Sequence, residues 1–573
     1  MTTLIANIGT SDLAIEIDGY YFPVGFDREE RNIPQPVTDS VEEAAWQLRF
    51  DEIRKLARHE LGMVLGDREN PSFRELTYRL FIAYQQAPEI WHSRLRPNRI
   101  FGVIKTAINA PFKVKDAYIF VTDHPEKDPD GSPNRGYPSD TIFLYDILAK
   151  WLEREIPQLK LHKWMIPQEI SAINQDRLLN YYYHFFQKTI HKDEILLISI
   201  KGGTPQMQTA LKVQAIASSN PQQLFIDPIL SIHNVLAGNP SDCQLTSYWQ
   251  YLRTQKYQTI QLLLKERWDF DGAIQILENW KGILKFLKKH ISDTQLIWND
   301  ELMVRVRQNL KLAIHCFNSD SQTAQDLLKD SSKLQLSPQL ISQVSDYNRL
   351  LNLYTQCRIY WELDQVANFL ARMTSFYEET LYQVNQCLEC ERYFEGHPEK
   401  WKLNTQVMRQ EMGESLWKEF KKLEGGYYAK LHPHNLEREP VVQLMNRYIK
   451  RSFIEVLVRF RSNSQEAMLW QEMQGLLKQL DYWVVQRNHL IHSVQGVSKQ
   501  RMWELWRSRR ESDSEACPPN KILQVMTEIS QNNLGIVEED YCQQFVGETA
   551  EYYIYCEVRD WAIAQLMNQG IAE

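Results

Sequence analysis

The chain has 573 residues, 43% of them hydrophobic, which is enough for several domains with buried cores. Its formal net charge of −8 excludes a basic coat over the whole protein of the kind that binds duplex nucleic acid. Eight cysteines in so long a chain exclude a disulfide framework, and no apolar run is long enough to span a membrane. The first ten residues lack a charged leader and a long apolar core, so we expect no signal peptide. We therefore expect a cytoplasmic protein.

Through the first 240 residues or so, short apolar runs alternate with helical patterns. The runs predict buried strands at 4–8, 117–122, 160–166, 194–200 and 222–226. The patterns between them predict helices at 51–65, 73–84, 142–155 and 174–189. This alternation predicts a Rossmann-like α/β domain, residues 1–247, in which helices cover both faces of a parallel sheet.

Two glycines and a threonine, Gly202-Gly203-Thr204, follow the most apolar of these runs. Glycine permits positive φ and a close approach of the backbone to a ligand, and Thr204 with Pro205 predicts the start of a helix over 205–218. The free N–H groups at such a helix start attract anions. The alternative is a turn in which the glycines are purely structural.

A second loop, Gly9-Thr10-Ser11, follows the first predicted strand. Loops at the carboxyl ends of parallel strands share one edge of the sheet, so we expect both loops to line one ligand site. Neither loop has the Lys-Ser/Thr of a P-loop or the G-x-G-x-x-G of a dinucleotide site. The expected ligand carries phosphates but is neither a Mg-bound triphosphate nor a standard dinucleotide.

After residue 247 the pattern becomes helical, with Trp, Tyr and Leu at helical spacings that indicate cores rather than a cofactor site. Helices are expected within 260–265, 273–287, 302–317, 347–361, 368–392, 441–460, 467–485 and 538–567. We expect a helical connector over 248–375 and an all-α domain over 376–573.

Near the C-terminus an arginine, an amide and two histidines lie within six residues, Arg487-Asn488-His489-Leu490-Ile491-His492. Arg can hold a phosphate with two parallel hydrogen bonds, and His can move protons near neutral pH. Residues five apart on a helix lie about 140° apart around its axis, so Arg487 and His492 converge only if the helix starts, ends or distorts there, or if a second copy completes the site. The alternative is a helix with a surface Arg and two structural histidines.

The charge around this motif is locally positive. Residues 441–510 hold twelve Lys and Arg against five Asp and Glu, an excess of seven. An excess of this kind is typical of a solvated helix face or of a surface that faces RNA.

The two ends of the chain together resemble a known family. A first-strand G-T-S-D loop, a later strand that ends in G-G-T-P, and R-N-x-x-x-H in a helical C-terminal domain are similar to the CARF–HEPN ribonucleases of type III CRISPR systems, the Csm/Csx-type effectors activated by cyclic oligoadenylate. Residues 250 to 375 or so match only as a helical connector, and Pro205-Gln206 stands where a basic residue is often seen.

The resemblance implies a CARF ligand-sensing domain that binds cyclic tetra- or hexa-adenylate at Gly9, Thr10, Ser11, Gly202, Gly203 and Thr204. It also implies a homodimer whose HEPN domains cleave single-stranded RNA through Arg487, Asn488 and His492, without a cofactor or metal. Two alternatives stay open. One is a HEPN toxin-type RNase controlled by a partner protein, and the other is a nucleotide-sensing interaction protein that cuts nothing.

Overall fold

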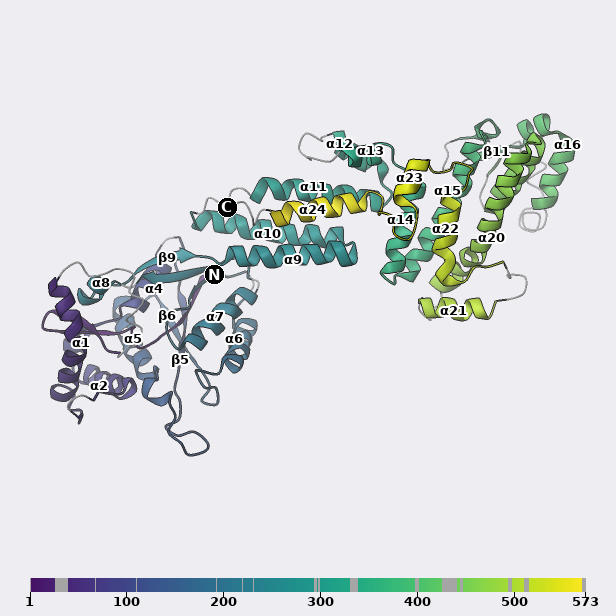
Figure 1. The fold of residues 1–573 in the computed structure, drawn as a ribbon. Coiled ribbons are helices and arrows are strands. Elements are labelled where there is room, and N and C mark those ends of the chain that lie inside the picture. The colour runs from purple at the N-terminus through teal and green to yellow at the C-terminus, as the bar shows by residue number, and fades with distance from the viewer. Residues whose placement is uncertain are drawn as a thin grey trace. The chain divides into compact units, whose positions relative to one another are not determined.

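The structure is a computed structural model in which the chain forms two compact units, shown in Figure 1. The α/β unit comprises residues 1–256 and 278–300, and the helical unit comprises 257–277 and 301–573. The described residues are 2–25, 40–66, 69–109, 111–191, 193–218, 220–229, 231–292, 296, 299–329, 338–396, 401–424, 441–443, 447–492, 497–509 and 515–568.

A six-stranded sheet with the strand order β6-β5-β1-β7-β8-β9 forms the centre of the α/β unit. Its strands are β1 (Thr2–Asn7), β5 (Asp116–Val121), β6 (Lys160–Met165), β7 (Ile195–Ser199), β8 (Gln223–Ile229) and β9 (Asp242–Thr246). All neighbours pair in parallel except β8 and β9. The central strands β1 and β7 are almost entirely buried, as expected of parallel strands covered on both faces.

Helices connect successive strands, and some of them cover the two faces of this sheet. They are α1 (Ser40–His59), α2 (Phe73–Gln86), α3 (Pro88–Arg94), α4 (Arg99–Ile108), α5 (Ile142–Glu155), α6 (Gln175–Thr189), α7 (Pro205–Ala217) and α8 (Ile232–Leu236). In Figure 1, α4 and α5 lie on one side of the sheet and α6 and α7 on the other. The chain moves outward from β1 through β5 to β6, returns to the other side of β1 at β7, and then moves outward in the opposite direction to β8. With right-handed crossovers, the helices of the two halves then lie on opposite faces of the sheet.

The sequence did not predict β9 or a second sheet, which has the order β3-β2-β4. Its strands β2 (Ala14–Ile17), β3 (Tyr20–Pro23) and β4 (Leu95–Arg96) pair antiparallel. Each has at most four residues, too few for an alternating pattern to stand out.

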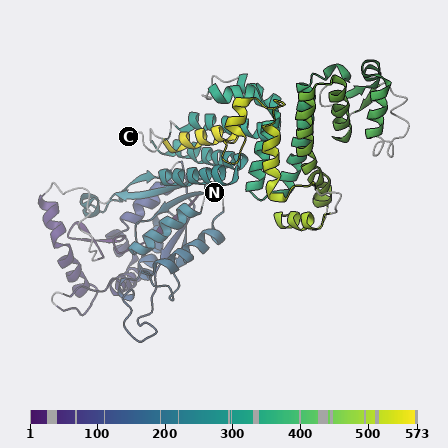
Figure 2. The same ribbon diagram turned by 45° about the vertical axis from the view of Figure 1, so that its right-hand side comes forward.

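The helical unit is built from helices packed around buried aromatic side chains such as Trp417, Trp470 and Trp483. The helices after β9 are α9 (Trp249–Arg267), α10 (Phe270–His290), α11 (Asn299–Phe317), α12 (Ser321–Lys329), α13 (Pro338–Ser345), α14 (Arg349–Glu362), α15 (Val366–Cys387), α16 (Thr405–Glu424), α19 (Arg447–Arg461), α20 (Ser464–His492), α21 (Lys499–Arg507), α22 (Ile522–Ser530), α23 (Glu539–Phe545) and α24 (Tyr555–Asn568). The C-terminal α24 runs beside α11 in Figure 1 and Figure 2, where the rings of Phe317 and Tyr555 lie 5.3 Å apart.

The predicted fold class, an α/β unit with a parallel sheet followed by a largely helical region, is confirmed. One helix prediction is wrong at its start. Residues Val441–Gln443 form strand β12, which pairs with β11 (Lys402–Asn404), and α19 begins only at Arg447. Backbone pairing with β11, itself paired with β10 (Phe394–Glu395), overrides the helical pattern of the apolar residues there. The division of the helical region at residue 375 stays a prediction.

Candidate functional site

The two glycine loops lie against each other at the carboxyl edge of the sheet. Gly9-Thr10-Ser11 follows β1 and Gly202-Gly203-Thr204 follows β7, and these two strands are parallel neighbours. A Cβ built on Gly9 would lie 2.8 Å from the backbone nitrogen of Gly203, which is closer than real Cβ atoms approach such an atom. The absence of a side chain at Gly9 therefore lets the loops touch.

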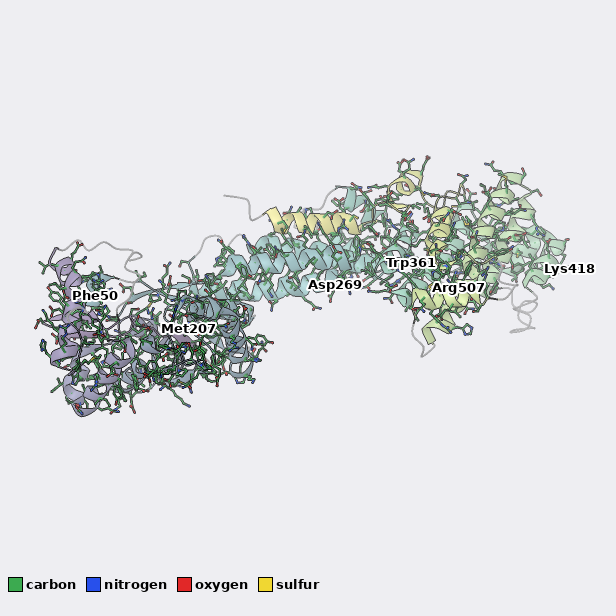
Figure 3. All side chains as sticks on the ribbon, turned by 60° about the horizontal axis from the view of Figure 1, so that its bottom comes forward. Phe50, Met207, Asp269, Trp361, Lys418 and Arg507 are labelled. Atoms are coloured by element: carbon green, nitrogen blue, oxygen red, sulfur yellow. The ribbon has the colours of Figure 1, made fainter. Side chains whose placement is uncertain are left out.

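The helix start predicted from Thr204 and Pro205 is present. Thr204 has extended φ and ψ, its side-chain oxygen accepts a hydrogen bond of 3.2 Å from the Met207 backbone N–H, and α7 begins at Pro205. Met207, labelled in Figure 3, belongs to the first turn of this helix. Gly202 and Gly203 have φ of 111° and 69°, a backbone region that glycine enters without strain. The loop thus directs the positive end of α7 toward the carboxyl edge.

A buried ion pair holds the first loop in place. Asp12 accepts a 2.7 Å hydrogen bond from the Gly9 backbone N–H and a 2.8 Å bond from Nε of Arg99, at the start of α4. A second guanidinium nitrogen of Arg99 also bonds Asp12, so the contact is bidentate. Both side chains are buried. Asp12 belongs to the G-T-S-D loop that the sequence singles out, but the sequence does not indicate Arg99, because nothing near position 99 signals a partner 87 residues away.

Arg99→Met is expected to lower the free energy of unfolding by about 3–5 kcal/mol, because it leaves the Asp12 carboxylate buried without its charged partner. Urea unfolding followed by circular dichroism measures this loss. Arg154→Met is the matched control, since Arg154 pairs with Glu89 at the protein surface. If both variants lose equally little stability, Asp12 and Arg99 do not anchor the loop.

A third loop of the same edge, after β5, contains a buried histidine. His124 donates from Nδ1 to Asp140 Oδ1 at 2.5 Å, and its Nε2 accepts from the Ala172 backbone N–H at 3.3 Å. The Thr204 hydroxyl donates to the carbonyl of the same Ala172. The His124 ring therefore connects this loop to the start of α7, and because both nitrogens are used, we assign it a positioning role.

Arg74 completes this network from α2. It bonds Asp140 at 2.8 Å and Asp123 at 2.7 Å. Burial lowers the pKa of Arg74, but the hydrogen bond to Asp123 and the charges of both carboxylates outweigh burial and raise the pKa above its ordinary value. Arg74 is therefore a permanent cation that neutralises the two acids beside the site.

In the helical unit, Arg487 lies near the carboxyl end of α20, which ends at His492. The helix is continuous through the motif, so Arg487 and His492 are about 140° apart around its axis and do not share a face. The side chains of Asn488 and His492 lie outside the described residues. His489 is exposed.

Arg487 lines a cleft of about 1460 Å³ within the helical unit. Its Nε atom is buried and has no hydrogen-bond partner among the described residues. Four further cations line the same cleft, namely Arg349, Arg372, Lys402 and Lys450. Five cationic side chains on one cleft favour an anionic ligand such as a phosphate.

Several other cations of the basic segment 441–510 are engaged within the protein. Arg447 and Arg451 both bond Asp481, and Arg451 also bonds the Tyr377 hydroxyl. Lys450 pairs with Glu378 at 2.5 Å. The local excess of positive charge therefore does not form one open basic face, and the Arg487 cleft is the better candidate for a phosphate.

Within the described ranges, no group of three or more His, Cys, Asp or Glu side chains is arranged to hold a metal ion. In the same part of the chain, no helix combines the length and the apolar character needed to cross a membrane.

No protein-family profile and no curated protein match the chain. Among solved structures, Enterococcus italicus Csm6 bound to cyclic hexa-2′-fluoro-hexa-dAMP is similar with a TM-score of 0.48 and 13% sequence identity. The alignment covers 99% of this chain and 100% of that one. At this level of similarity, the function has to be argued from the residues themselves.

Proposed function

We propose that this chain is a cyclic-oligoadenylate-activated, metal-independent endoribonuclease that cleaves single-stranded RNA in the cytoplasm as part of type III CRISPR antiviral defence. The observation that carries the proposal is Arg487, which lines a cleft together with four further cations and whose buried Nε has no hydrogen-bond partner among the described residues. The carboxyl edge with its two touching glycine loops supplies a separate place for a phosphate-bearing activator.

In the proposed reaction the RNA's own 2′-oxygen attacks the adjacent phosphorus. The P–O bond to the 5′-oxygen of the next nucleotide breaks, and a 2′,3′-cyclic phosphate forms. Arg487 binds and neutralises the phosphate, and His492 takes part in the proton transfers, from the 2′-hydroxyl or to the 5′-oxygen. Asn488 orients the pair. The nucleophile belongs to the substrate, so the residues named here suffice.

The proposed enzyme is a homodimer with one shared active site. Because α20 is continuous, positions 487 and 492 of one copy lie about 140° apart around the helix axis. Two copies related by a two-fold axis present the same motif twice, so Arg487 of one protomer can face His492 of its partner. The same symmetry places two copies of the carboxyl edge opposite a ring with repeated phosphates.

A cleavage assay on labelled single-stranded RNA, with and without cyclic tetra- and hexa-adenylate, tests the proposal. We expect one of the rings to stimulate cleavage, EDTA to leave the rate unchanged, and the products to end in 2′,3′-cyclic phosphate. Cleavage that no ring stimulates favours an RNase controlled by a partner protein. RNA left intact under every condition favours a sensing protein without catalysis.

A further inference from the structure

The cleft beside Arg487 continues along one face of α15. Residues at helical spacing on this face line it, namely Ala371, Ser375, Glu378, Tyr382 and Gln386. This stretch of helix is about 22 Å long, since each residue adds about 1.5 Å. The cleft is therefore much longer than one phosphate group requires.

Four aromatic side chains line the cleft, namely Tyr347, Tyr382, Trp401 and Tyr541, and two of them, Tyr382 and Trp401, pack against each other. Their ring centroids lie 4.9 Å apart, and Trp401 also stacks on Phe394 with centroids 4.6 Å apart and planes 8° apart. The pairing of β10 with β11, which begins directly after Trp401, holds Phe394 and Trp401 next to each other. The aromatic group is thus rigidly supported.

These rings are not ordinary core residues. Trp417, Trp470 and Trp483 of the same unit are at most 1% exposed, whereas Tyr382, Phe394 and Trp401 are only half-buried. A half-buried, supported aromatic surface in a cleft suits a flat ligand.

Positive charge lies next to these rings. Lys402 directly follows Trp401, is exposed, and lies opposite Glu395 in the pairing of β10 with β11. Lys450 lines the cleft midway along α15, where it pairs with Glu378. The acidic residues Glu378 and Glu379 make the cleft mixed in charge, which disfavours a closely packed duplex backbone. Stacking surfaces with scattered cations are typical of single-strand binding.

We propose that Tyr382 and Trp401 form a stacking subsite for an unpaired base of the RNA strand whose phosphate lies at Arg487, with Lys402 beside that strand's backbone. The inference rests on the proposed function for its choice of RNA as the ligand. Stacking needs a base that is splayed out of a helix, so the subsite explains a preference for single strands. It predicts that base identity near the cut matters less than the absence of pairing.

Fluorescence anisotropy with a labelled single-stranded RNA tests the subsite in the Arg487→Ala protein, which is expected to cleave the probe roughly 10²–10⁴-fold more slowly than the parent. We expect Trp401→Ala and Tyr382→Ala each to raise the Kd about 5- to 150-fold, which corresponds to about 1–3 kcal/mol per stacked base. Trp401→Phe keeps an aromatic face and is expected to restore most of the affinity. In protein with an intact Arg487, Trp401→Ala should raise KM and leave kcat nearly unchanged.

Trp503→Ala is the matched control. Trp503 is also half-buried, but it lies on α21, whose last residue Arg507 is labelled in Figure 3, and it does not line the cleft. We expect Trp503→Ala, introduced into the Arg487→Ala protein, to leave the Kd for the RNA unchanged. Equal losses from Trp503→Ala and Trp401→Ala, or unchanged affinity in both cleft variants, overturn the subsite.

The outcomes also separate the subsite from catalysis. Trp401-dependent binding of single-stranded RNA by a protein that never cleaves it supports the subsite and rejects the endoribonuclease. Ring-stimulated cleavage with a KM that does not change in Trp401→Ala supports the endoribonuclease and rejects the subsite. A duplex of the same sequence that binds as tightly as the single strand also rejects the subsite.

Discussion

Arg487→Ala and His492→Ala are each expected to lower the rate of RNA cleavage by roughly 10²–10⁴-fold. Arg487 is proposed to stabilise the charge that develops on the phosphate, and the cleft places its guanidinium where no described protein group competes for Nε. His492 is proposed to move the protons. Initial rates at saturating RNA and activator measure both effects, and size-exclusion chromatography checks that the oligomeric state is retained.

Two further variants make this prediction specific. Arg487→Lys keeps the charge but loses the planar fork, so we expect it to remain far below the parent rate. Lys478→Ala removes a cation from the same helix α20, where Lys478 is partly exposed 4.0 Å from Glu515, and should cleave like the parent. Parent-like rates in both the Arg487→Ala and the His492→Ala variants, or a parent activity that EDTA abolishes, would contradict the metal-independent mechanism.

Gly203→Trp is expected to abolish activation by cyclic oligoadenylate and to leave the basal cleavage rate intact. A Cβ on Gly203 would lie 2.9 Å from Sδ and Cε of Met207, the far end of a flexible side chain, so the indole can be accommodated while it fills the ligand site. Positive φ at Gly203 adds about 1–2 kcal/mol of strain. Gly202 is less suitable, because its Cβ would lie 2.5 Å from the Asn7 carbonyl oxygen.

The size of this effect follows from linkage. A ligand activates only by the difference in its affinity for the active and inactive arrangements, which is typically worth about 5- to 150-fold. For the parent we therefore expect the cleavage rate with the ring to exceed the rate without it by about this factor. For the Gly203 variant we expect the two rates to be equal. Binding of the ring measured by calorimetry should weaken in parallel.

Gly19→Trp is the control for backbone strain. Gly19 also has positive φ, at 85°, but it lies in the turn between β2 and β3 and nothing comes within 4 Å of its added Cβ. This variant should be stimulated like the parent. A Gly203 variant that is stimulated as strongly as the Gly19 variant would place the activator site elsewhere.

The sequence alone determined the structure around β7 and α7. A run of apolar residues, two glycines, Thr204 and Pro205 are each local signals, and the strand, the turn and the helix start all follow them. Such features depend on backbone torsions and on hydrogen bonds that span three or four residues. Both are determined by residues that are neighbours in the sequence. The sequence also predicted that the two loops meet, because the carboxyl ends of parallel strands lie at the same edge of a sheet.

Only the tertiary structure decided which distant residues complete each site. Arg99 reaches Asp12 from 87 positions away. Tyr382 and Trp401 share the cleft of Arg487, although one lies on a different helix and the other directly before a short strand. Strand β12 exists because β11 pairs with it, against the helical pattern of its own residues. These contacts depend on packing and pairing between segments far apart in the chain, and no local pattern of residues carries that information.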